Sequence, residues 1–82
     1  MMMHSFDRIN VITENDQVLE VDVTSYKADA IWILVGKGEH SVKCKLMPSR
    51  NELAYVGSVM GRELIYKRSV KQVRVDLQQA RR

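Results

Sequence analysis

The sequence of 82 residues predicts an α+β domain, in which an antiparallel five-stranded meander or small partly open barrel is followed by one C-terminal amphipathic helix. Strand-like runs separated by short turns occupy the chain from Phe6 to Tyr66. No apolar run reaches the ~18–20 residues of a membrane span. A helical pattern with a capping residue begins only at Ser69. The predicted order is therefore β-β-β-β-β-α.

The first two strands are predicted at residues 7–13 and 18–26. Apolar and polar residues alternate from Leu19 to Val23, which is the pattern of a strand with one buried face. Residues 14–17 contain Asn and Asp, which favour a turn because both tolerate left-handed backbone geometry.

The third strand is predicted at residues 30–35. It has no polar face, a pattern typical of a central strand covered on both sides. The short connection at residues 27–29 predicts an antiparallel hairpin with the second strand. A turn with two glycines at residues 36–39 leads to the fourth strand, residues 41–47, which ends at Pro48 because proline cannot donate to a ladder.

The fifth strand is predicted at residues 53–60, with a bulge or bend at Gly61 and a continuation to Tyr66. The helix begins after Ser69, a good N-cap, and Gln72 three residues later completes a capping box. One apolar stripe, suited to docking on the sheet, is formed by Val70, Val73, Leu77 and Ala80.

A chain of this length makes one domain, which we assign to residues 6–82 behind a flexible tail of residues 1–5. Cys44 is the only cysteine, so no intrachain disulfide can form. A small domain without disulfides is typical of the reducing cytoplasm. We therefore expect a cytoplasmic protein that does not enter membranes, and the small size favours an origin in a bacterium or in something that infects one.

The sequence offers no catalytic or metal-binding constellation. His40 and Cys44 lie four residues apart, about 13 Å along a strand, which is outside hydrogen-bond reach. Cys44 alternates with lysines and is therefore expected in the core, whereas His40 is expected in a solvated loop. One cysteine and two histidines lack the spacing of zinc ligands. We expect a protein that is not an enzyme and has no cofactor and no small-molecule substrate.

The third strand supplies the candidate protein interface. The helix is too small to cover a whole sheet face, so one row of this strand is expected to stay partly exposed, namely Trp32, Leu34 and Ala30. Charged rows are expected to flank it, with Glu20 and Asp22 on one strand and Lys43 and Lys45 on another. An apolar centre with a polar rim is typical of a protein-binding surface. The alternative is a sheet that curls so tightly that both rows become core.

The leading hypothesis is therefore a small interaction module that binds a protein partner or itself. A homodimer would use the face of the third strand or an open sheet edge.

The alternative function is nucleic-acid binding by the basic C-terminal half. Residues 1–42 hold three basic and seven acidic residues, whereas residues 43–82 hold ten basic and three acidic ones. Such asymmetry can mark a polyanion-binding end. The candidate cations are Arg62, Lys67, Arg68, Lys71, Arg74, Arg81 and Arg82. Two simpler interpretations remain: the two halves neutralise each other as neighbours, or the cations form only a solvated face. The hypothesis depends on whether these cations form one unpaired surface.

Overall fold

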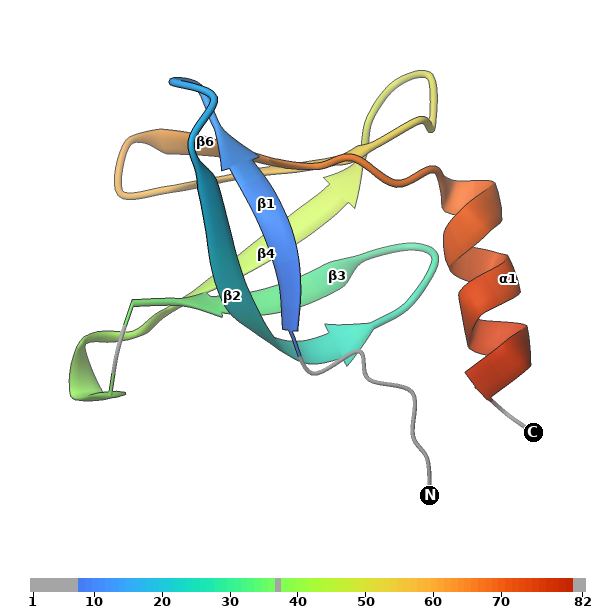
Figure 1. Ribbon diagram of the computed structural model, residues 1–82, viewed down its shortest axis with the longest axis horizontal. Coiled ribbons are helices and arrows are strands. Elements are labelled where there is room, and N and C mark those ends of the chain that lie inside the picture. The colour runs from blue at the N-terminus through green and yellow to red at the C-terminus, as the bar shows by residue number, and fades with distance from the viewer. Residues whose placement is uncertain (1–7, 37, 81–82) are drawn as a thin grey trace.

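The computed structural model describes residues 8–36 and 38–80, and it shows a closed barrel of six antiparallel strands with a helix at its C-terminal end (Figure 1). The elements are β1 (Arg8–Thr13), β2 (Val18–Tyr26), β3 (Ile31–Val35), the 3-10 turn η1 (Gly38–His40), β4 (Val42–Pro48), β5 (Tyr55–Val59), β6 (Arg62–Tyr66) and α1 (Val70–Ala80). Each strand pairs with the next, and β1 pairs with β6. The predicted tail at residues 1–5 and the predicted strand start at Asp7 lie outside the described residues.

The α+β class and the C-terminal helix are confirmed, but two details of the predicted sheet are wrong. The sheet has six strands and is closed, whereas five strands and a partly open barrel were predicted. The difference lies at Gly61, where a bulge or bend within one strand was predicted and a hairpin turn is found between β5 and β6. Met60 has φ 53° and Gly61 has φ 75°. Two positive φ values characterise a type I′ turn, which reverses the chain within two residues.

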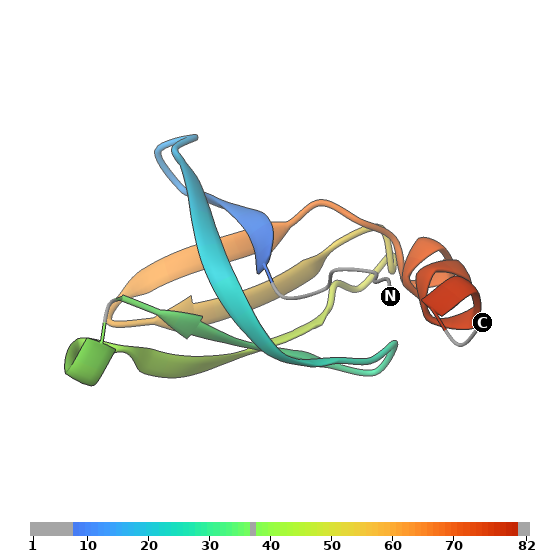
Figure 2. The same ribbon diagram turned by 60° about the horizontal axis from the view of Figure 1, so that its bottom comes forward.

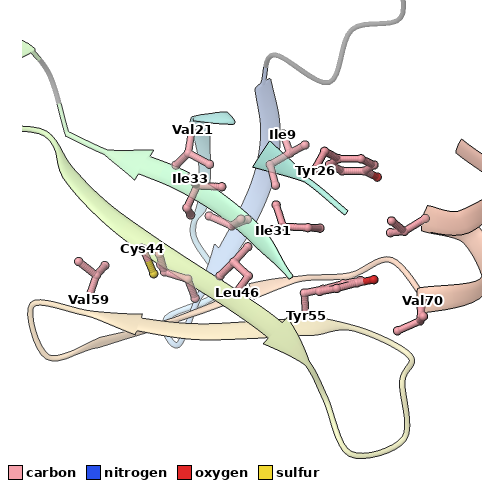
Figure 3. Packing of buried hydrophobic residues seen from close by; sticks show 13 residues of the cluster. Ile9, Val21, Tyr26, Ile31, Ile33, Cys44, Leu46, Tyr55, Val59 and Val70 are labelled. Carbon is pink, nitrogen blue, oxygen red and sulfur yellow. The ribbon is translucent and has the colours of Figure 1, made fainter. Parts of the chain in front are cut away.

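The core fills the inside of the barrel, because every strand turns alternate side chains inward (Figure 3). The residues with at most 1% exposure are Val11, Ile31, Ile33, Leu46, Tyr55, Leu64 and Val73. Cys44 is also buried there, as predicted. The core is therefore drawn from both the strands and the helix.

A close approach between β5 and β4 helps to close the barrel. Gly57 occupies an inward position of β5, and a Cβ atom there would lie 2.6 Å from the carbonyl oxygen of Lys45 and 2.8 Å from Cδ2 of Leu46. Real Cβ atoms essentially never come so near. Glycine therefore lets β5 lie against the main chain of β4.

The ladders of the barrel differ in length. The strands β1 to β4 form a continuous meander, and β5 and β6 form a separate hairpin. The two parts meet along short seams. At one seam Met47 pairs with Val56 and Pro48 with Tyr55, and at the other Ile12 pairs with Ile65 and Thr13 with Leu64.

The helix α1 covers one end of the barrel (Figures 1 and 2). Ser69 is the predicted N-cap, since its Oγ accepts the Gln72 N–H at 3.1 Å. The Gln72 side chain instead donates to Oδ1 of Asp76 at 3.4 Å, so the reciprocal bond of the predicted capping box is replaced. Three members of the predicted apolar stripe pack as expected, with Val70 and Val73 buried and Leu77 half-buried against the core, whereas the side chain of Ala80 lies outside the described residues.

Candidate functional site

The outer face of β3 carries the predicted apolar row. Ile31 and Ile33 point into the core, whereas Trp32 and Leu34 alternate with them, point outward and are half-buried. Ala30 immediately precedes the strand, and its carbonyl oxygen accepts the Lys27 N–H at 3.1 Å. Ala30 therefore belongs to the turn into β3. The barrel curls around the inner row only, so the outer row lacks the covering layer predicted for a strand without a polar face.

Two lysines of β4 cover the Trp32 ring. Lys45 is the direct cross-strand partner of Trp32, and Lys43 is the partner of Leu34. The Nζ atoms of Lys43 and Lys45 each lie 5.6 Å from the centre of the ring. Cation–π contacts of this kind stabilise exposed sites by about 0.5–1 kcal/mol. Neither lysine forms an ion pair with a carboxylate in the part of the chain that the structure describes.

Carboxylates flank the other side of the same row. Asp22 of β2 pairs across the ladder with Leu34, so Asp22, Leu34 and Lys43 lie in one line across three strands. Arg8 of β1 binds both Asp22 at 3.2 Å and Glu20 at 3.5 Å. These three charged side chains are about 60% exposed, so the pairs stabilise the fold little.

We call this surface the β3 face, defined by Asp22, Trp32, Leu34, Lys43 and Lys45. It has an apolar centre with an acidic side chain on the β2 side and two basic side chains on the β4 side. The two predicted charged rows lie on opposite sides of β3. The lysines flank both Trp32 and Leu34, whereas Asp22 flanks Leu34, and the neighbour of Trp32 on β2 is Ser25.

A second outer row was missed by the sequence analysis. Cross-strand partners connect five apolar residues around the outside of the barrel, in the order Met47, Val56, Ile65, Ile12 and Val18. Two of these contacts, Met47 with Val56 and Ile12 with Ile65, lie on the two seams. Apolar cross-strand pairs stabilise a sheet. The row thus has a structural role in closing the barrel, and it could have been recognised only from the register.

The end of the barrel next to α1 holds a polar cluster. Arg68 binds Asp76 with two hydrogen bonds, from Nε at 2.6 Å and Nη2 at 2.7 Å. Tyr26 donates to the same carboxylate at 2.9 Å, and its hydroxyl lies 3.0 Å from that of Tyr66. Arg8, Ile9, Asn10 and Glu20 complete a cleft of about 420 Å³ beside these four residues.

The chemistry of this cluster favours a structural role. Hydrogen bonds from Arg68 lower the pKa of Asp76 below its ordinary value. Burial, together with the bonds to Tyr66 and Asp76, raises the pKa of Tyr26 well above its ordinary value. A general acid or base works best with a pKa near the operating pH. Asp76 therefore stays ionised and Tyr26 protonated, and together they hold α1 on the barrel.

The structure does not bring the predicted polyanion-binding residues together. Arg62 begins β6 at the barrel end opposite α1 (Figure 1), and Arg68 is occupied by Asp76. Arg74 lines the same hollow as Asp29 and Glu52. Lys67 and Lys71 are exposed near the start of α1, and Arg81 and Arg82 lie outside the described residues.

A helical projection places Asp76 on the side of α1 away from Lys71 and Arg74. That placement holds for residues within α1, but Arg68 precedes the helix and bends back to Asp76. A helical projection does not represent such a contact.

The two candidate reactive residues lie apart from each other. Cys44 is inside the barrel, where burial raises the pKa of its thiol and Sγ lies 3.8 Å from the Ser58 carbonyl oxygen. His40 is exposed at the end of η1. Within residues 8–36 and 38–80, no three His, Cys, Asp or Glu side chains are placed to hold a metal ion.

The described residues contain no helix with the length and apolarity needed to cross a membrane. No protein-family model, curated protein or solved structure matches the chain.

Proposed function

We propose that this protein is a non-catalytic binding module that contacts a protein partner through the β3 face. The observation that carries the proposal is the outward row of Trp32 and Leu34, in which Leu34 lies between Asp22 and Lys43 and Trp32 lies beside Lys45. Tryptophan is enriched at the energetic centres of protein interfaces, where a polar rim surrounds an apolar core. The face has this composition.

Closure of the barrel favours a partner contact through the sheet face rather than through a sheet edge. Every strand of the closed sheet has a neighbour on each side, although β1 pairs with β6 only at Ile12 and Thr13, whereas an open sheet offers a whole free strand for pairing with another chain. Closure therefore favours the sheet face over a sheet edge, and we propose the face as the contact.

The presence of both acidic and basic side chains on the β3 face favours a protein partner over a nucleic acid. A strand of phosphates lying across Trp32 would gain from Lys43 and Lys45 but would meet Asp22 and Glu20 on the other side of β3. Among the described cations predicted to bind polyanions, Arg62 lies at the barrel end opposite α1, away from Lys67 and Lys71. A protein surface that itself carries both signs suits this face better.

The test is photo-crosslinking in cells that naturally produce the protein. The benzophenone amino acid is placed at Leu34, and a matched control places it at Glu63 on β6, which is opposite β3 in the six-strand ring. Position 34 should give discrete protein adducts that position 63 does not. Adducts that disappear on nuclease treatment, equal adducts at both positions, or no adduct at position 34 would each reject the proposal. The mass of the adduct shows whether the partner is a second copy or another protein.

A further inference from the structure

We infer that the partner of the β3 face is a second copy of this chain, related by a two-fold axis that runs along β3. This inference rests on the proposed function and specifies its partner. It follows from the order of the side chains across three strands, in which Asp22, Leu34 and Lys43 occupy one line.

A two-fold axis that lies between two facing sheets and runs parallel to β3 exchanges the two sides of that strand. It therefore places β4 of each copy over β2 of the other, so that Lys43 faces the second copy's Asp22 and Asp22 faces its Lys43. An axis across the strands would instead place β4 over β4 and lysine over lysine. Only the axis along β3 makes the face complementary to itself.

The centre of the face fits the same arrangement. Residues on the line of the axis meet their own equivalents, so Leu34 lies against Leu34 and Trp32 against Trp32 of the two copies. Both side chains are half-buried in a single chain and have apolar surface left to cover. Lys43 and Lys45 already cluster around the Trp32 ring, and the carboxylate of Asp22 has only Arg8 as an ion-pair partner among the described residues. The lysines of each copy can therefore form ion pairs with Asp22 of the other copy.

The test reverses the charges of Asp22 and Lys43 and measures dimer formation by sedimentation of the full chain at low salt. Asp22→Lys makes both ends of the line formed by Asp22, Leu34 and Lys43 basic, and Lys43→Asp makes both ends of that line acidic. Each variant alone should bind itself at least about a hundredfold more weakly than the unaltered protein, since like charges that face each other cost several kcal/mol. The two variants mixed together should form a 1:1 heterodimer. The double variant D22K/K43D should dimerise again, because its complementarity is restored with the signs reversed.

Two controls separate charge on this face from net charge. Glu63→Lys lies on β6 and Lys71→Asp lies on α1, and both should leave the dimer unchanged. Circular dichroism checks that every variant is folded. Trp32 is the only tryptophan, so its emission should shift to the blue as the unaltered protein associates and should not shift in either single variant.

Three results would overturn the inference: an unaltered protein that stays monomeric at about 100 μM, single variants that dimerise as well as the unaltered protein, or a mixture that does not associate. Crosslinking from position 34 to a different protein alone would also overturn it. That last result would leave the proposed function standing, whereas absence of any adduct would remove both.

Discussion

Gly57 of β5 lies against the carbonyl oxygen of Lys45 on β4 so closely that a Cβ atom at position 57 would be 2.6 Å from that oxygen. We expect Gly57→Ala to lower the free energy of unfolding by about 1–3 kcal/mol, because the strands must separate to admit the methyl group. Urea unfolding measures this loss. The neighbouring exposed variant Ser58→Ala should change stability by less than about 0.5 kcal/mol. A Gly57→Ala protein as stable as the parent would show that the strands do not depend on the close approach.

The turn between β5 and β6 offers a gain in stability. Met60 holds a positive φ of 53°, which costs an ordinary residue about 1–2 kcal/mol and costs asparagine less. Met60→Asn creates the favoured Asn-Gly turn with Gly61, and we expect stability to rise by about 0.5–1 kcal/mol. Met60→Ala has the same steric cost as methionine and should give no gain. Equal stabilisation by both variants in urea unfolding would contradict this explanation.

Adjacent residues of β3 should differ sharply in their contribution to stability. Ile33 has no exposed surface, so Ile33→Ala should cost about 2–5 kcal/mol. Trp32 points outward, and Trp32→Ala should cost only about 1–1.5 kcal/mol, from its cross-strand contacts. The two losses are compared in thermal and urea unfolding at a concentration where the protein is monomeric. Equal losses would mean that Trp32 belongs to the core and would weaken the assignment of the β3 face.

The bond between Asp76 and Arg68 should make stability depend on pH. The folded-state pKa of Asp76 lies below its ordinary value of about 3.8, so the ionised group contributes stability above that pH and loses it as pH falls through the folded pKa. Asp76→Asn should cost about 1.5–3 kcal/mol at pH 7, since it removes hydrogen bonds to a charged group. The difference in the free energy of unfolding between the parent and Asp76→Asn should become smaller as the pH falls below about 4.

Urea unfolding between pH 7 and pH 3 measures this narrowing. Glu63→Gln serves as the control, because Glu63 is exposed and forms no ion pair among the described residues. If the free energies of unfolding of the parent and Asp76→Asn differ by the same amount over this range, Asp76 is not the source of the pH dependence.

Local patterns predicted the features that depend on neighbours in sequence. Ser69 was recognised as an N-cap because capping needs one hydroxyl near the first helical turn, and Oγ of Ser69 does accept the Gln72 N–H. The two rows of β3 followed from the alternation of Ile31 and Ile33 with Trp32 and Leu34. The flanking charges followed from the same period-two rule on β2 and β4.

The missed features depend on partners far along the chain or on unusual turn chemistry. Pairing of Ile12 with Ile65 closes the barrel, and no local pattern encodes a contact over such a separation. The Met60-Gly61 turn was not predicted, and a bulge or bend was expected there instead, because methionine seldom adopts a positive φ. Arg68 was counted as a free cation because its partner Asp76 is reached by a chain bend that a helical projection omits.

The two short seams have a consequence for how the barrel assembles. The β1–β4 meander and the β5–β6 hairpin contain contacts between neighbouring strands only, which form quickly. The Ile12–Ile65 seam must close a long loop first, so its closure is expected late in folding. In native-state hydrogen exchange, the same seam should open before the ladders on either side of it, and the amide of Ile65 should report that opening separately from global unfolding.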